Sequence, residues 1–379
     1  MNKYTTDQRN SDLFDVFNVT QFDDFYGKAI PELEADPVIA CAHALDSAMK
    51  MLEPQIRKHI DAYNSMQGAK KKASSAQRKR KSGAGRPGRD PVDMVRLCLV
   101  QRYLNLSDLA MESSVRYDIR VRRAVGWLTL STVPDRKTIW KYRNLFDKCG
   151  LFSVLFADFT SKAQALLDKA FPKTAGKRKL AAVDSTFNEA PEQRNTREEN
   201  AVIKEGKGDT LWNDNPNKKC HKDIDARWTK KRGETHFGYK LHVLADMRIK
   251  LIVSQYTTDA AQHDSRHLIP LLNKSLNGSS IYVDSGYTSD ENKEECSRLG
   301  INLRLIDRPY RNKPLTEQQN TDNHRKSRIR IRIEHIFGYV EQTMRGLTLR
   351  CVGYVRAASN GSLTCLMYNI MRMWQLKML

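Results

Sequence analysis

The order of strand and helix patterns after Lys179 constrains the fold of this chain more than any other feature of its sequence. Short apolar segments between polar or turn residues predict strands at 180–184, 238–244, 250–256, 280–284 and 302–306. Helical periodicity predicts helices at 263–274, 290–299 and 325–345, the first of them kinked or delayed by Pro270. Three strands followed by alternating helices and strands predict a mixed five-stranded α/β sheet with flanking helices.

The chain before this sheet has a helical and then a strongly basic character. Residues 1–66 contain one apolar stripe and predict an accessory helical region. Residues 67–89 predict a mobile basic linker, because residues 70–89 hold nine Lys or Arg and no acid. We expect this linker to contact phosphates, for example through Lys79 and Arg80; a spacer that binds nothing is the alternative.

Residues 90–150 predict a domain of short helices joined by tight turns. Asp90 and Pro91 are typical of a capped helix start, Ser107 predicts a second start, and Pro134 and Asp135 a third. We interpret the domain as a helix-turn-helix-like DNA-binding unit, or alternatively as a helical bundle for dimerisation. The expected DNA contacts on its third helix are Arg136, Lys137 and Lys141, next to the aromatic Trp140.

The charge balance indicates the class of partner. Sixty-four Lys and Arg against 44 Asp and Glu give a net charge of +20, which favours a nucleic-acid partner. Neither a secretory signal nor a stretch of ~18 apolar residues is visible, so we expect a cytoplasmic, nucleoid-associated protein without a membrane partner. The seven cysteines form no Cys-x-x-Cys pair, and Cys220 beside His221 is only a weak indication of zinc.

Two predicted strands end in the same dipeptide, Asp-Ser. Asp184 follows apolar residues 181–183, and Asp284 follows apolar residues 281–283. A single Asp in this position is most often a turn residue or a cap. Glu334 makes the two aspartates a candidate site, because it borders the apolar stripe of the last predicted helix and is expected at the edge of the sheet. Considered by itself, Glu334 would be expected to form an exposed ion pair with Arg330, which lies four residues earlier on the same helix.

Three carboxylates on rigid elements suffice to bind Mg²⁺, and basic residues beside them would bind phosphates.

Trp228 is expected either to pack normally or to stack on an unpaired base. Lys240 and His242 face the same way by strand alternation and are expected to touch the carboxylates or the DNA. The polar insertion 187–236 carries Asp223 and Asp225, which either support the site or belong to a solvated loop that orders on DNA.

Several ordered motifs resemble those of a known family. They are Asp-Ile-Asp-Ala-Arg-Trp at 223–228, His-Phe-Gly-Tyr-Lys-Leu-His at 236–242, Asp-Ser-Gly-Tyr at 284–287 and Arg-Ile-Arg-Ile-Glu-His-Ile-Phe-Gly at 330–338. Together with the segment from Gly85 to Trp140, they look like the bacterial insertion-sequence transposases of the IS-five type, over residues 85–355. These are DDE enzymes, so the resemblance implies an RNase H-like fold for 151–379, after the helical domain at 90–150.

The resemblance implies that Asp184, Asp284 and Glu334 are the catalytic, metal-binding triad, holding two Mg²⁺ ions with Mn²⁺ as a substitute. It also implies binding to terminal inverted repeats in double-stranded DNA, hydrolysis at the element ends, and transfer of the 3′-hydroxyl ends into target DNA. Because two ends must be joined, we expect a homodimer or a higher synaptic complex.

Two positions depart from the family pattern. Ser327 and Glu341 stand where the family often carries Tyr and Lys. Arg330 fits the pattern and is an expected DNA contact with Arg328, and Arg345 is a substitute for the missing Lys. The alternatives left open are a metal-dependent nuclease without strand transfer and a DNA-binding protein with a decayed site.

Overall fold

The computed structural model describes residues 36–74, 88–126, 133–172, 180–231, 233–309 and 314–379. The chain forms two compact units. One contains the described part of Met1–Leu151 with residues 373–377 and 379, and the other contains Phe152–Arg372 with Met378. Within these described residues, no helix has the length and apolar character needed to span a membrane.

The first unit is all-helical. Its long first helix buries the predicted apolar stripe from Ile39 to Leu52, and Asp36 caps its start through the Val38 and Ile39 amides. Asp90, Ser107 and Asp135 cap the next helices as predicted. The helices are α2 (Pro37–Ser74), α3 (Pro91–Tyr103), α4 (Asp108–Tyr117), α5 (Ile119–Val125) and α6 (Arg136–Cys149).

Two predictions for this unit need correction. The linker was expected to begin at residue 67, but α2 continues to Ser74, because helical hydrogen bonding does not require an apolar stripe in its last turns. The short α5 was not predicted. Lys79 and Arg80 lie outside the described residues.

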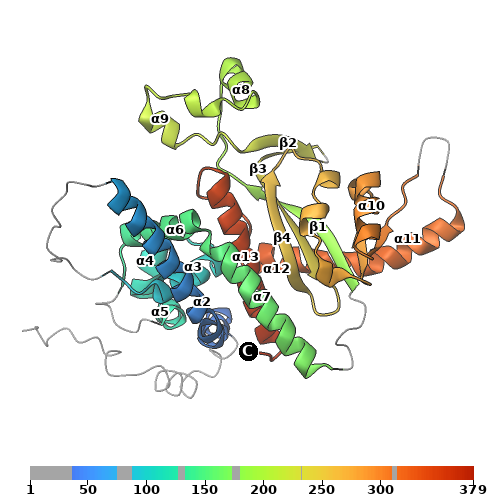
Figure 1. Ribbon diagram of the computed structural model, residues 1–379, viewed down its shortest axis with the longest axis horizontal. Helices are drawn as coiled ribbons and strands as arrows, with labels where there is room; N and C mark the ends of the chain where they lie inside the picture. Colours follow the sequence, from blue (N-terminus) through green and yellow to red (C-terminus); the bar gives the residue numbers. More distant parts are fainter. Residues whose placement is uncertain (1–35, 75–87, 127–132, 173–179, 232, 310–313) are drawn as a thin grey trace, which may run out of the picture. The chain divides into compact units, whose positions relative to one another are not determined.

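The second unit is built on a six-stranded mixed sheet (Figure 1). Its central strand β1 pairs antiparallel with β3 and parallel with β5; β4 and β2 pair with β3, and β6 pairs with β5. The strands are β1 (Leu180–Glu189), β2 (Arg227–Lys231), β3 (Glu234–Asp246), β4 (Leu251–Asp259), β5 (Ser280–Val283) and β6 (Asn302–Leu305). The predicted mixed sheet is confirmed, with β2 as an additional sixth strand.

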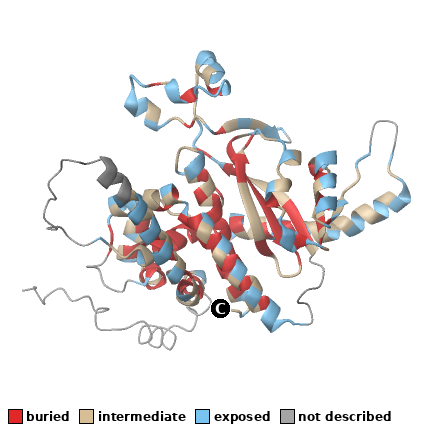
Figure 2. Ribbon diagram, viewed as in Figure 1, coloured by how far each residue is buried: buried red, intermediate tan, exposed pale blue. Residues whose placement is uncertain are grey.

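Helices cover both faces of the sheet, so the buried residues (red in Figure 2) follow its strands. One face carries Ala181 and Val183 and packs with Cys296 of α10 (Asp290–Arg298) in an apolar cluster. The opposite face meets α13 (Tyr354–Gln375), where Gly361 lies so close to Leu241 that an added Cβ would be 3.0 Å from its side chain. The Asn369 side chain also bonds the backbone of Ile252 and the hydroxyl of Thr160 on α7 (Leu151–Ala170).

The remaining elements differ from the sequence prediction. In place of the helix at 263–274 there are three short 3₁₀ turns, because Pro270 lacks an amide hydrogen. The long helix at 325–345 is divided into α11 (Glu317–Arg330), a 3₁₀ turn (Ile331–Ile333) and α12 (Glu334–Gln342). The insertion between β1 and β2 holds α8 (Arg197–Lys204), a 3₁₀ turn (Gly208–Thr210) and α9 (Pro216–Cys220), and a last 3₁₀ turn (Ser285–Tyr287) follows β5.

Candidate active site

Asp184 lies in the middle of β1. The prediction that the strand ends there is wrong, because residues 185–189 continue to pair with β3 as far as Gly238. Asp184 pairs with Val243, and strand alternation places its side chain on the same face as Thr186 and Leu241, the face that α13 covers. Its side chain is 22% exposed, so the carboxylate is accessible but largely desolvated.

Asp284 directly follows β5, as predicted. The parallel register of β1 and β5 ends at the pair of Ala182 and Tyr282, and Asp184 and Asp284 each follow two residues later. The two carboxylates are close enough for the charge of Asp284 to raise the pKa of Asp184. Neighbouring strands lie about 4.8 Å apart, so two carboxylates project from adjacent backbones. Each carboxylate accepts a hydrogen bond from the amide of the following serine, at 2.8 Å for Asp184 and 2.7 Å for Asp284, which fixes its orientation.

Glu334 is the first residue of α12, and its neighbour Arg330 connects it to the strand. Arg330 donates from Nη1 to Asp184 Oδ2 at 2.9 Å and from Nη2 to Glu334 Oε1 at 3.2 Å. The predicted pair between Arg330 and Glu334 is therefore present, and the guanidinium also reaches a carboxylate 146 residues away in sequence. One cation thus bridges two of the three candidate acids.

The electrostatic environment of Asp184 is that of a buried acid surrounded by charges. Burial raises the pKa of its carboxyl group, while the Ser185 amide, Arg330 and Lys231 oppose this shift and nearby Asp284 adds to it. An additional positive charge at this point would therefore stabilise the ionised carboxylate.

A second polar layer lies on the other face of β1, and the sequence did not predict it. Ser185 donates to Asp264 at 3.4 Å, and Lys240 donates to the same carboxylate at 3.1 Å. Tyr287 is buried beside Ser185 and Asp264, and its burial raises the pKa of its hydroxyl strongly. The one indication of this cluster in the sequence was the strand alternation that places the Lys240 side chain on this face of the sheet.

The prediction that His242 touches the carboxylates or the DNA is wrong. His242 is fully buried on the face opposite Asp184, where its Nε2 contacts the Thr258 hydroxyl at 3.0 Å. Burial lowers the pKa of this imidazole to about 3. It is therefore a neutral histidine of the core.

Asp223 is also buried, which contradicts its placement in a solvated loop or beside the catalytic acids. Its carboxylate accepts hydrogen bonds from the Tyr239 hydroxyl at 2.9 and 3.0 Å and from the Gly353 amide at 3.0 Å. Asp225 accepts from the Tyr354 amide at 2.9 Å. These bonds attach the base of the insertion to β3 and to the start of α13, so both acids are structural.

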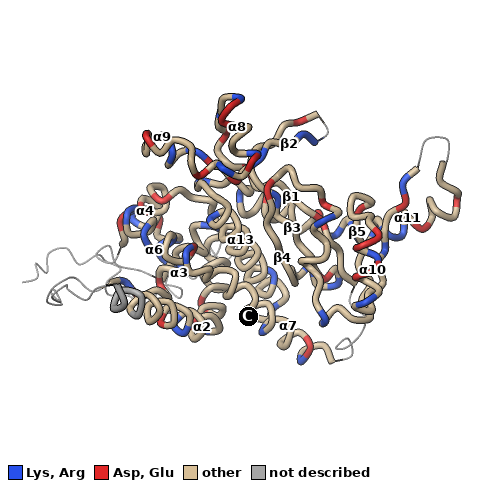
Figure 3. The backbone as a smooth tube through the Cα atoms, turned by 45° about the horizontal axis from the view of Figure 1, so that its top comes forward, with Lys and Arg blue, Asp and Glu red and all other residues tan. Residues whose placement is uncertain are grey.

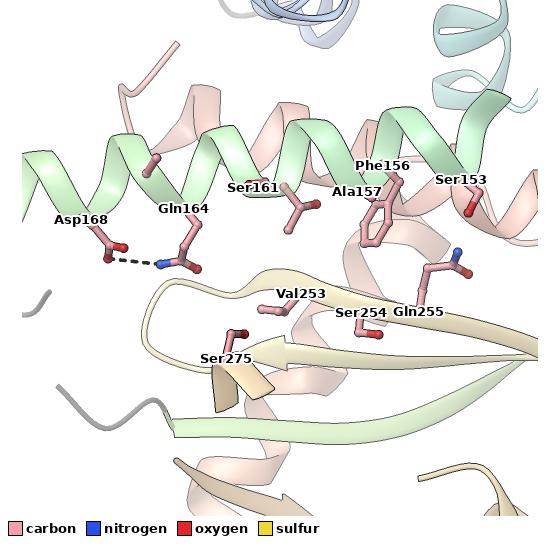
Figure 4. Close-up of a pocket in the computed structure, with 12 residues that line it drawn as sticks. Ser153, Phe156, Ala157, Ser161, Gln164, Asp168, Val253, Ser254, Gln255 and Ser275 are labelled. Carbon is pink, nitrogen blue, oxygen red and sulfur yellow. Dashed lines mark hydrogen bonds between the residues drawn. The ribbon is translucent and has the colours of Figure 1, made fainter. Parts of the chain in front are cut away.

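A pocket between α7 and β4 lacks the chemistry expected of the site (Figure 4). No basic side chain lines it, and its single acid, Asp168, accepts a hydrogen bond from Gln164 at 3.4 Å. Such a pocket has nothing to bind an anionic polymer.

The comparisons with known families agree with this geometry. The family described as Transposase DDE domain matches residues 175–370, which contain all three acids. The chain belongs to this DDE transposase family. A second family, described as Transposase domain (DUF772), matches residues 47–145 of the transposase. No solved structure matches the chain.

Membership confirms the RNase H-like fold class and transposase activity, and it implies that the protein binds DNA. In the helical unit, the predicted contacts Arg136, Lys137 and Lys141 are exposed on α6, and Trp140 beside them is 55% exposed. Ile139 and Phe146 are buried on the other side of the same helix. The transposase therefore presents a basic face with one aromatic ring to solvent.

In the catalytic unit, Lys and Arg recur along α11 (Figure 3), and Arg328 is exposed there. Trp228 is 45% exposed, and its ring packs at a tilt of 40° against the ring of Phe237, with 4.9 Å between centroids. Arg345 was expected to share a helix face with Glu341 and to substitute for the missing Lys, but it lies beyond α12, which ends at Gln342, and has a left-handed φ of 58°. Its role as a DNA contact stays a prediction. The Lys240 ammonium is paired with Asp264, and its role as a DNA contact stays a prediction.

DDE transposases generally use divalent metal ions, and the donor set of this protein fits them. The acids offer hard oxygen ligands, one on β1, one directly after β5 and one at the start of α12, and Arg330 already supplies a cation between Asp184 and Glu334. Within the described residues, no group of three or more His, Cys, Asp or Glu is yet close enough to hold an ion.

Proposed function

We propose that Asp184, Asp284 and Glu334 are the catalytic triad of an insertion-sequence transposase of the IS-five type. In this proposal the enzyme binds the terminal inverted repeats of its element, hydrolyses the phosphodiester at each end and transfers the 3′-hydroxyl ends into target DNA. The triad would hold two Mg²⁺ ions, with Mn²⁺ as a substitute, and the enzyme would act in the nucleoid as a homodimer or a higher synaptic complex.

The observation that carries the proposal is the bridge made by Arg330. A guanidinium bound to both Asp184 and Glu334 indicates that these carboxylates share a site of negative potential. Asp284 adds a third negative charge directly after the neighbouring strand β5, near enough to raise the pKa of Asp184. Three acids with a single shared cation leave a net negative site that a divalent ion would neutralise.

The residues of the chain have distinct tasks in this scheme. The Ser185 and Ser285 amides each hold one carboxylate oxygen, which would leave the second oxygen of Asp184 and of Asp284 to coordinate a metal ion. Asp184, Asp284 and Glu334 would hold the metal ions, whose chemistry would be activation of a water and stabilisation of the departing 3′-oxygen. Arg330, once released from Asp184, is positioned to bind a phosphate oxygen of the strand.

The two units divide the work in this proposal. The exposed basic face of α6 supports a DNA-binding or dimerisation role for 90–150, preceded by an accessory region and a basic linker. Residues 151–379 would carry the chemistry, and Arg328, Arg345 and Trp228 would contact flanking DNA. Exposure of the Trp228 ring supports stacking on an unpaired base.

The test compares cleavage and binding in the same variants. Asp284→Asn should abolish Mg²⁺-dependent cleavage of a duplex carrying the terminal repeat and leave its binding nearly unchanged, because a metal ligand is lost but the phosphate contacts remain. Parallel loss of binding and cleavage in a folded variant would refute the assignment. Cleavage without joining would favour a nuclease, and binding without cleavage by the wild type would favour a decayed site.

A further inference from the structure

The turn between β3 and β4, residues 247–250, is held by side chains from the C-terminal part of the chain. The Met247 carbonyl accepts a hydrogen bond from Arg332 Nη1 at 3.2 Å. The Ile249 carbonyl accepts one from Arg372 Nε at 2.7 Å. One arginine comes from the 3₁₀ turn before α12 and the other from α13. Two guanidiniums from separate elements are therefore fixed on one short turn.

Lys250 closes the turn and adds a third cation. Its ammonium donates to His335 Nδ1 at 2.8 Å, and its carbonyl accepts a hydrogen bond from the Tyr368 hydroxyl at 2.8 Å. Because an ammonium can only donate, Nδ1 is the acceptor and the imidazole keeps its hydrogen on Nε2. The φ of Lys250 is +54°, a conformation that costs a residue with a Cβ about 1–2 kcal/mol. A lysine held where glycine would fold at lower cost is typical of a functional position.

These three cations have little opposing charge. Arg248, on the same turn, is neutralised by the buried carboxylate of Asp246. Among the residues that the structure describes, no ion pair joins Lys250 or Arg332 to a carboxylate. Burial lowers the pKa of the Lys250 ammonium, and the charges of Arg372 and Arg332 lower it further. Like charges gathered in this way repel one another, and a bound anion would offset the repulsion.

An exposed strip connects this cluster to the candidate active site. Arg332 and His335 flank Glu334, and all three residues are exposed. Asp184 pairs with Val243, which lies four residues before the turn. At roughly 3.3 Å per residue, the turn is about 13 Å from Asp184 along the sheet. A DNA duplex rises about 3.4 Å per base pair, so this distance corresponds to about four base pairs.

We propose that Lys250 and Arg332, supported by the charge of Arg372, bind a phosphate of the DNA about four nucleotides from the bond that is cut. The ligand is the phosphodiester backbone, since guanidinium and ammonium groups bind phosphate oxygens through charge-assisted hydrogen bonds. A backbone contact at this distance would fix the position of the duplex on the acids without reading its sequence. The inference rests on the proposed function, because the distance is counted from a cut made at these acids.

Two variants serve as controls for the loss of Arg332. Arg304→Gln removes the same charge from an exposed position on β6, a strand that β1 and β5 separate from β3. Arg332→Lys keeps the charge at its own position. Arg332→Gln removes that charge but retains an amide that can donate to the Met247 carbonyl.

The experiment measures binding of a labelled terminal-repeat duplex to the full chain as a function of salt, without Mg²⁺. Arg332→Gln should lower the slope of log K against log salt by about 0.9, the value for one lost phosphate contact. This loss corresponds to about fivefold weaker binding at 0.15 M salt, with 1 M salt as the reference. Arg304→Gln should keep the wild-type slope, and Arg332→Lys should restore it. An arginine that only caps the turn would not alter the slope.

Neutral methylphosphonate linkages, placed one at a time from the end of the repeat, identify the phosphate. About four nucleotides from the cut they should weaken binding by the wild type and by Arg304→Gln, but not by Arg332→Gln. Equal effects in all three proteins at every position, or equal salt slopes for the two Gln variants, would overturn the inference. Cleavage by the wild type with Mg²⁺ is scored separately, so that failure of the triad assignment is distinguished from failure of this contact.

Discussion

Arg330 should compete with divalent metal for the candidate triad, and its removal should therefore strengthen metal binding. In the structure its guanidinium bonds Asp184 and Glu334 together. Metal coordination by the same oxygens requires the bond to Asp184 to break. Arg330→Met removes the competing cation and keeps a side chain of similar reach.

The magnitude follows from the burial of the ion pair. The Arg330 and Asp184 side chains are 21% and 22% exposed, which lies between a surface pair worth about 0–1 kcal/mol and a buried pair whose disruption costs about 3–5 kcal/mol. We take about 1–3 kcal/mol for the bond. Because the metal no longer has to displace the guanidinium, Arg330→Met should bind the first ion about 5- to 150-fold more tightly.

The assay is Mn²⁺ binding to the full chain without DNA, followed by electron paramagnetic resonance of the free ion. Arg328→Met is the control, because it removes one charge from an exposed position on the same helix. The reasoning predicts a tighter Mn²⁺ dissociation constant for Arg330→Met than for both the wild type and Arg328→Met. Weaker or equal binding by Arg330→Met would refute it.

Two further predictions concern stability. Asp223→Ala should lower the free energy of unfolding in urea by about 3–5 kcal/mol, because the Tyr239 hydroxyl and the Gly353 amide lose a charged acceptor. Asp225→Ala should lower it by only about 1 kcal/mol, because one amide bond is lost. Equal losses in the two variants would contradict the bonding described. Because the pKa of His242 is about 3 when folded and 6.5 for the free side chain, the unfolded chain binds its proton first, and stability should fall as pH drops from 6.5 toward 3. His242→Gln should flatten this decline, and an unchanged pH profile would count against the assignment.

Local signals were sufficient to predict much of the fold from the sequence. The caps Asp90, Ser107 and Asp135 act within a few residues, so the helices that they begin were predicted correctly. The apolar runs that precede Asp184 and Asp284 likewise identified two core strands. The spacing of Arg330 and Glu334 on one helical turn predicted their ion pair.

The errors arise where distant segments decide the structure. The polar second half of β1 is stabilised by pairing with β3, about fifty residues later, which no local pattern reveals. Asp223 was expected either to support the site or to belong to a solvated loop, and neither is correct, because its partners Tyr239 and Gly353 come from elements distant in sequence. The second bond of Arg330, to Asp184, depends in the same way on the packing of α11 against β1.

The most direct test of the central claim is incubation of the purified protein with a labelled terminal-repeat duplex, Mg²⁺ and a target plasmid, comparing the wild type with Asp184→Ala. The account predicts nicked duplex and plasmid-joined product for the wild type, both dependent on Mg²⁺, and neither product for Asp184→Ala. Joined product from Asp184→Ala at the wild-type level would contradict the assignment of the triad.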